Sequence, residues 1–165
     1  MIVFDASTLI LITKIELLGV FLEEFGMEVA IPKEVESECC GNKVMFDAFV
    51  IQKALDESKI KAHGVRNKKL VAKLQLDFNL GKGEAEAITL AFEKKALLVG
   101  IDDKNGISAC KLLNLAFTTA IGILLRIHEK GLIDRDTAMA KLRALARHGR
   151  YKNSILEDAR PRLEK

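Results

Sequence analysis

Short apolar segments alternate with longer segments of helical spacing along this chain. The apolar segments are IVF (2–4), EVAI (28–31), KIKAHGV (59–65), ALLVGI (96–101) and LAFT (115–118). Strands that alternate with helices of about 10 to 15 residues form βαβ units around a parallel sheet. Several segments are apolar throughout, as strands buried on both faces are. The sequence therefore predicts an α/β protein with an α/β/α sandwich architecture.

The segments between and after these strands have the spacing of helices. The predicted helices cover residues 9–25, 33–40, 44–57, 66–78 and 83–95, a stretch after Asp103, residues 120–131 and two further C-terminal segments. Ser7 or Thr8 is expected to cap the first helix, which we expect to break at Gly19. Pro32 stands where the second helix should begin. A length of 165 residues indicates a single domain.

The composition is that of a soluble globular protein, with 49% hydrophobic and 30% charged residues. No apolar run approaches the ~20 residues of a membrane span, and the N-terminus lacks the basic region of a signal peptide. We therefore expect a cytoplasmic protein without a membrane partner. Residues 126–165 carry 11 Lys/Arg against 6 Asp/Glu, whereas the remainder has a net charge of −2. A basic C-terminal segment permits a polyanionic partner.

The cysteines and histidines form no metal-binding motif. Cys39 and Cys40 are adjacent and Cys110 stands alone, so their spacing matches no zinc site. Buried, unreactive thiols are the expectation. The three histidines are scattered along the chain (His63, His128 and His148).

Two aspartates directly follow predicted strands. Asp5 ends the segment at 2–4, and Asp102 ends the segment at 96–101. Ligands of open parallel sheets bind outside the carboxyl ends of the strands, so both carboxylates should lie at the same edge. A solvated aspartate at the start of a loop is the alternative for either residue alone. Two aspartates at equivalent strand ends weaken that alternative.

The segment LGKGEAEA contains two glutamates, Glu84 and Glu86, that are expected to differ. Helical spacing places Glu84 on the same face as the apolar residues Ala87, Ile88 and Ala91, toward the sheet. Glu86 is expected on the exposed side. Compensation of the helix dipole is the alternative role for Glu84. A phosphate-binding loop is excluded, because such a loop needs Gly-Lys followed by Ser or Thr.

A fourth acidic candidate is Glu38, in the segment IPKEVESECC. Glu38 shares a helical stripe with Val35, whereas Glu34 and Glu36 are expected to be exposed acids of the first turn. Three or four converging carboxylates without a basic residue repel one another. Mg²⁺ or Mn²⁺ relieves such repulsion through oxygen ligands and can activate water at a phosphodiester.

The order of VFDASTLILITK, IPKEVESE, LGKGEAEAITLA, LLVGIDD and NLAFTTAIGILLRIHEKGLI resembles the PIN-domain ribonucleases, close to the VapC-type toxins. The resemblance covers about residues 1–130 of a single domain at 1–165, with 131–165 as a helical C-terminal extension. It implies a PIN-like fold with a central parallel sheet of about five strands. It also implies metal-dependent cleavage of single-stranded RNA, frequent homodimers and, in this branch, a cognate antitoxin.

The same resemblance places the catalytic acids of the family on Asp5, Glu38, Glu84 and Asp102. It implies that Asp5, Glu84, Asp102 and the adjoining Asp103 hold Mg²⁺ or Mn²⁺. Ser7 is available to bond the Asp5 carboxylate. Basic residues are expected to follow the RNA backbone (Lys82, Lys104 and those of the C-terminal segment).

The chain departs from the family at two places near this site. Relatives often carry an arginine where this chain has Gly106-Ile107, and a Gly-Thr pair where it has Thr119-Ala120. These departures leave the acidic residues intact. They remove a guanidinium group and a hydroxyl group that would help to position the substrate. The alternative function is therefore a PIN-fold module with weak or no catalysis, which acts through RNA or protein binding.

Overall fold

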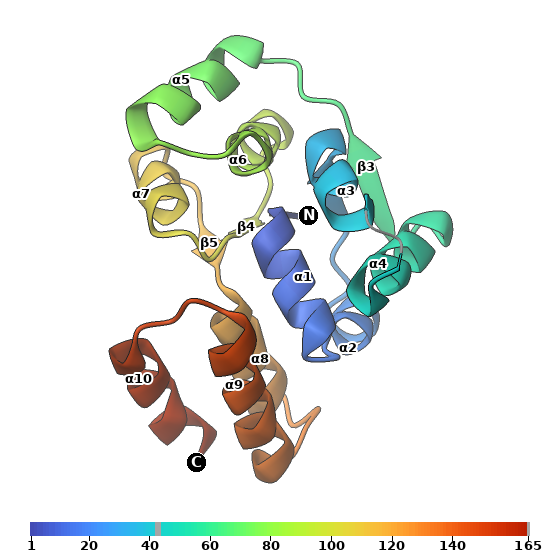
Figure 1. Cartoon of the computed structure of the whole chain (residues 1–165), viewed down its shortest axis with the longest axis vertical. Coiled ribbons are helices and arrows are strands. Elements are labelled where there is room, and N and C mark those ends of the chain that lie inside the picture. Colours follow the sequence, from blue (N-terminus) through green and yellow to red (C-terminus); the bar gives the residue numbers. More distant parts are fainter. Residues whose placement is uncertain (42–43, 165) are drawn as a thin grey trace.

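Five short strands form one parallel sheet in the order β3-β2-β1-β4-β5 (Figure 1). The structure is a computed structural model that describes residues 1–41 and 44–164. The strands are β1 (Ile2–Phe4), β2 (Val29–Pro32), β3 (Ile60–His63), β4 (Leu98–Gly100) and β5 (Phe117–Thr118). Every strand pairing is parallel, and helices connect successive strands. The predicted parallel five-stranded sheet is confirmed.

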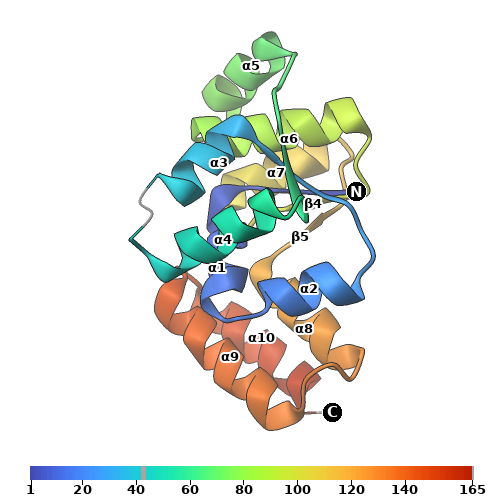
Figure 2. The same ribbon diagram turned by 90° about the vertical axis from the view of Figure 1, so that its right-hand side faces the viewer.

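Helices cover both faces of this sheet (Figures 1 and 2). They are α1 (Ala6–Lys14), α2 (Leu18–Glu24), α3 (Lys33–Cys40), α4 (Phe46–Asp56), α5 (Lys68–Phe78), α6 (Lys82–Lys94), α7 (Lys104–Leu112), α8 (Ala120–Glu129), α9 (Arg135–His148) and α10 (Asn153–Leu163). Figure 2 shows α5, α6 and α7 on one side of the strands and α1, α2 and α8 on the other. The α/β/α sandwich is therefore also confirmed.

The alternation of side chains along β1 divides the interior into two cores. Ile2 and Phe4 point into a cluster with residues of α1, α2, α8 and α9. Val3 points the other way, into a cluster with residues of α5, α6 and α7. All three side chains are fully buried, and burial of each contributes roughly 2 kcal/mol to folding. The central strand is thereby fixed from both faces.

The first helix ends earlier than the sequence suggests. The expected break at Gly19 is wrong, because α1 ends at Lys14 and Gly19 lies inside α2. Glu16 takes a left-handed conformation with φ 57°. The amide of Glu16 bonds the Thr13 carbonyl, and the amide of Leu17 bonds the Ile12 carbonyl. These two bonds form a Schellman termination, which returns Leu17 to the core.

The strand order reverses between β1 and β4. The chain first moves from β1 to β2 and β3, and then returns to place β4 on the other side of β1. The amide of Asp5 donates to the Gly100 carbonyl at 3.0 Å, so the pairing of the two strands continues to their carboxyl ends. A reversal of this kind opens a crevice at the carboxyl ends of the strands, where ligands of such sheets bind.

The helices α9 and α10 pack against α8 at one end of the molecule (Figures 1 and 2). An ion pair between Arg162 and Glu129, at 2.7 Å, ties α10 to α8. Within residues 1–41 and 44–164, no helix is both long enough and apolar enough to cross a lipid bilayer.

Candidate active site

Asp5 lies at the centre of the sheet edge and is fully buried. Its carboxylate starts α1: Oδ1 accepts from the Thr8 amide and Oδ2 from the Ser7 hydroxyl, both at 2.8 Å. Burial raises the pKa of Asp5 to about 7; hydrogen bonds from Thr8 and Ser7 oppose this, and the negative charge of Asp102 adds to it. A cation close to this carboxyl group would favour its ionised form.

Asp102 follows β4, on the other side of the strand reversal. Its Oδ2 accepts from the amide of Ala120, the first residue of α8, at 2.9 Å. Its Oδ1 accepts from the hydroxyl of Tyr151 at 2.6 Å. Asp102 is therefore held by a helix start and by a side chain from the segment between α9 and α10. Its neighbour Asp103 caps α7 by accepting from the Gly106 amide at 2.9 Å.

Glu84 is half-buried in the first turn of α6. Its Oε2 accepts from the Gly81 amide at 3.0 Å, so Glu84 also completes a helix start. Burial raises the pKa of Glu84, the bond from Gly81 opposes the rise, and the charge of Asp103 adds to it. Glu84 therefore stabilises the start of α6, as the alternative role requires. It also lies close enough to Asp103 for the two charges to interact.

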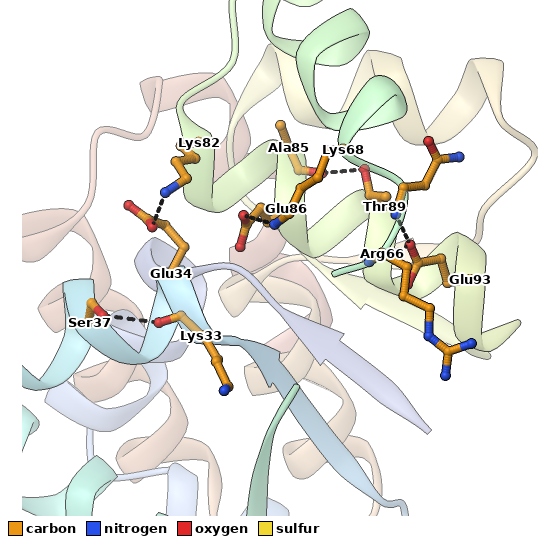
Figure 3. A network of polar contacts seen from close by, with 11 residues as sticks. Lys33, Glu34, Ser37, Arg66, Lys68, Lys82, Ala85, Glu86, Thr89 and Glu93 are labelled. Atoms are coloured by element: carbon orange, nitrogen blue, oxygen red, sulfur yellow. Dashed lines mark hydrogen bonds and ion pairs between the residues drawn. The ribbon is translucent and has the colours of Figure 1, made fainter. Parts of the chain in front are cut away.

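Glu38 reaches the same region from α3. A side chain at Gly83 would collide with the Glu38 carboxylate, so the missing side chain of Gly83 makes room for it. Although Glu38 as a residue is exposed, partial burial of its carboxyl group raises its pKa, as do the charges of Glu34 and Glu84. The nearby Lys82 pairs with Glu34 at 2.6 Å (Figure 3).

A cleft of about 880 Å³ opens at this edge of the sheet. Three of the predicted acids line it (Glu84, Asp102 and Asp103), together with Ser7. Asp5, which accepts from Ser7, and Glu38 are not among the lining residues. Basic side chains line the same cleft: Lys14, Lys104, Lys111, His148, Arg150 and Lys152. The cleft thus combines carboxylates with cationic groups that can bind phosphates.

The donors at this edge fit a hard divalent cation in their chemistry. They are carboxylate oxygens, which Mg²⁺ and Mn²⁺ prefer. Within the described residues, no three Asp, Glu, His or Cys side chains already form a group that could hold a metal ion. Asp5, Glu84 and Asp103 each accept from a backbone amide at a helix start instead.

The expectation that Glu86 is exposed is wrong. Glu86 is 5% exposed, and its Oε1 lies 3.1 Å from Nζ of Lys68 (Figure 3). The expectation assumed that one face of α6 meets solvent. In the structure α6 packs against the sheet, α3 and α5, so residues 85–91 are all buried. Glu86 is absent from the cleft lining, which Glu84 joins.

The residues at the two departures from the family pattern have structural roles near the cleft. Position 120 contributes its backbone amide to Asp102, which any residue except proline can do. The hydroxyl of Thr119 caps α8 by accepting from the Gly122 amide at 3.1 Å. Gly106 packs against Ile101, where a side chain would collide. Lys104, Lys111 and Arg150 supply positive charge to the cleft in place of an arginine near position 107.

Tyr151 is the functional candidate that the sequence did not reveal. It contacts Asp102 across 49 positions, so no local motif contains both residues. The only available signal was its place in a basic stretch between two predicted helices. Burial, the charge of Asp102 and the bond to it all raise the pKa of the Tyr151 phenol, which therefore stays protonated as a donor.

Comparison with known families agrees with this fold. The chain matches the family model of the PIN domain over residues 1–164, which includes the C-terminal helices. Neither the search of curated proteins nor the search of solved structures gave a match. The match to the family model covers far more than half of the chain, and the parallel sheet has the expected layers. The chain belongs to the PIN-domain family.

Proposed function

We propose that this protein is a metal-dependent endoribonuclease that cleaves single-stranded RNA in the cleft at the sheet edge. PIN domains are generally nucleases and typically use divalent metal ions, which gives the coarse class. The observation that carries the proposal is the lining of the cleft, where Glu84, Asp102 and Asp103 occur together with four lysines and Arg150. Carboxylates and cationic groups in one cleft suit a phosphodiester substrate.

In this proposal Asp5, Glu84, Asp102 and Asp103 hold Mg²⁺ or Mn²⁺, and Glu38 completes the acidic set. When bound, the cation supplies activation of water and compensates charge on the phosphodiester. The Ser7 hydroxyl orients the Asp5 carboxylate through its 2.8 Å hydrogen bond. Burial raises the pKa of Asp5 and the charge of Asp102 adds to this rise, so positive charge near Asp5 would favour its ionised form.

The cationic residues of the cleft would bind the RNA backbone. Lys104 and Lys111 belong to α7, whereas Arg150 and Lys152 come from the segment between α9 and α10. Lys82 is a weaker candidate than the sequence suggested, because its ammonium group pairs with Glu34. Contacts to phosphates should make RNA affinity fall as salt concentration rises.

The test is RNA cleavage with and without Mn²⁺ by the wild-type protein, Asp5→Asn and Asp102→Asn. Both variants keep the size of the side chain and one acceptor oxygen but remove the charge. Asp136→Asn is the matched control, because Asp136 is an exposed acid in the first turn of α9 and does not line the cleft. Metal-stimulated cleavage should be lost in the first two variants and kept in the control. Equal activity in all four proteins would refute the proposal.

A second candidate function is a PIN-fold module that binds RNA or protein with little or no catalysis. It is favoured by the two departures near the site, where Gly106-Ile107 and Thr119-Ala120 stand in place of the arginine and the Gly-Thr pair that relatives often carry. Titration of the purified protein with Mn²⁺ distinguishes the two functions. Failure to bind Mn²⁺ while the protein binds RNA would favour the second.

We also propose that the protein is the toxin of a toxin–antitoxin pair, forms a homodimer and is inhibited by an antitoxin. The support is the resemblance of its motifs to the VapC-type toxins. Induced expression should then arrest growth for the wild type and not for Asp102→Asn. Normal growth with full-length, soluble wild-type protein would contradict the toxin role. Sedimentation of the purified protein tests the homodimer.

A further inference from the structure

The contact between Tyr151 and Asp102 joins the C-terminal helices to the acidic edge of the sheet. The Tyr151 hydroxyl donates to Asp102 Oδ1 at 2.6 Å, and the Ala120 amide donates to Oδ2 at 2.9 Å. We propose that Tyr151 is a positioning residue that holds the Asp102 carboxylate in the orientation in which it takes a divalent cation. This inference rests on the proposed metal-dependent function and assigns part of the site to the C-terminal helices.

The two donors leave Asp102 able to bind a cation. An ionised carboxylate has about four lone-pair directions on its two oxygens. Tyr151 and Ala120 each use one direction, on different oxygens, so each oxygen keeps another. The terminal torsion of a free aspartate is broad, and two donors on opposite oxygens restrict it. Hydrogen bonds to ligating carboxylates commonly orient metal ligands in this way.

The position of the tyrosine ring depends on Gly149. A side chain at position 149 would collide with the ring of Tyr151. The backbone of Gly149 is extended, with φ −101° and ψ 165°, so alanine is compatible with its conformation. Glycine at position 149 therefore makes room for the ring of Tyr151, and the backbone conformation there does not require glycine. Gly149→Ala should displace the hydroxyl of Tyr151 without removing it.

The segment that carries Tyr151 is held at both ends. α9 precedes it and α10 follows it, and both helices pack against α8. The start of α8 supplies the second donor to Asp102, from Ala120. The same three-helix unit therefore provides both hydrogen bonds to this carboxylate, which fixes the distance between the two donors.

The first test is the affinity of the full-length protein for Mn²⁺, measured by electron paramagnetic resonance or calorimetry. Tyr151→Phe removes the hydroxyl and keeps the ring, and we expect a roughly 10-fold loss of affinity. Ser154→Ala is the control, because it removes an exposed hydroxyl three residues away and outside the cleft lining. Unchanged affinity in Tyr151→Phe would overturn the proposal. Tighter binding would also overturn it and would make the hydroxyl a barrier to the metal.

Gly149→Ala provides an independent variant that retains the tyrosine. It should weaken Mn²⁺ binding in the same direction as Tyr151→Phe. Gly64→Ala is its control, since a side chain at position 64 meets no atom within 4 Å. Wild-type Mn²⁺ affinity in Gly149→Ala, together with a changed tyrosine emission that shows the ring has moved, would overturn the positioning role.

The fluorescence of the protein reports on this contact directly. The chain has one tyrosine and no tryptophan, so tyrosine emission comes from Tyr151 alone. A carboxylate that accepts the phenolic hydrogen bond quenches this emission, and Asp102→Asn should therefore increase it. If the increase occurs but the wild type binds no Mn²⁺, the contact is real and both the metal-dependent function and the positioning role fail. If the wild type binds Mn²⁺ only as tightly as Tyr151→Phe does, only the positioning role fails.

Discussion

Glu86 and Lys68 form an ion pair at 3.1 Å in which the carboxylate is buried and the lysine is largely exposed. The pair joins α6 to α5. Glu86 follows Glu84 by two residues, and Glu84 lines the cleft. Two chemically identical side chains in one helical turn therefore have separable roles.

Glu84→Gln should abolish metal-dependent cleavage, because it removes a carboxylate from the cleft. Glu86→Gln should keep the activity of each folded molecule and lower the free energy of unfolding by about 1 kcal/mol, through loss of the charge that faces Lys68. Cleavage assays and urea denaturation of both variants check this pair. Equal loss of cleavage in both would contradict the separation of roles.

Stability in the absence of metal should depend on pH through Asp5. The folded-state pKa is about 7 and lies above the usual value of 3.8, so the folded state binds more protons than the unfolded state between these values. The contribution of Asp5 to the free energy of unfolding is therefore greatest below about pH 4. It falls as pH rises and levels off above about pH 7. The full contribution is on the order of 4 kcal/mol.

Urea denaturation of the wild type and Asp5→Asn from pH 4 to pH 8 measures this contribution. The asparagine variant should show a flatter dependence, because its side chain does not titrate. Added Mg²⁺ should stabilise the wild type more at pH 8 than at pH 5, where protons compete with it. Parallel pH profiles for the two proteins would show that the Asp5 carboxyl group is not the titrating group.

The same substitution should have opposite effects at two glycines. A side chain at Gly100 would collide with the buried ring of Phe4, so Gly100→Ala should cost about 2 kcal/mol through overpacking. Gly19 lies in α2, where a side chain would meet no atom within 4 Å, and Gly19→Ala should add roughly 0.5–1 kcal/mol. Chemical denaturation measures both. Destabilisation by Gly19→Ala would contradict the open surroundings of that position.

The three cysteines should be unreactive in the native protein. All are buried, and none forms a disulfide. Burial raises the pKa of the Cys39 and Cys110 thiols, and the thiolate is the reactive form. A thiol reagent such as Ellman's reagent should react slowly with native protein and rapidly with all three cysteines in urea. Fast reaction of one thiol without denaturant would show that its environment opens.

The elements of the fold could be predicted because their signals are local. The apolar run at 2–4 stopped by Asp5, and the run at 96–101 stopped by Asp102, indicate strand ends without knowledge of the rest of the chain. The parallel arrangement then brings both aspartates to one edge. Both aspartates follow strands at that edge as predicted, and Glu84 and Asp102 line the cleft there, whereas their role as site residues stays a prediction.

The remaining features depend on contacts between distant segments. The burial of Glu86 follows from the packing of α5 on α6, which the spacing within α6 does not encode. The contact of Tyr151 with Asp102 depends on where the C-terminal helices pack. The end of α1 depends on a left-handed Glu16, although the sequence offers Gly19 as the more usual terminator. Tertiary packing outweighed local preference in each case.

The acids at the sheet edge also start helices, which affects how the site should be dissected by mutagenesis. Asp5 and Asp103 accept from an amide in the first turn of α1 and α7, and Glu84 accepts from the amide of Gly81, the N-cap residue of α6. Replacement of such a capping residue by alanine typically costs about 1 kcal/mol of stability. Alanine variants of these acids would therefore lose activity partly through lower stability. An alanine scan would overestimate the contribution of these acids to catalysis. Asparagine and glutamine keep an oxygen for the amide and isolate the role of the charge.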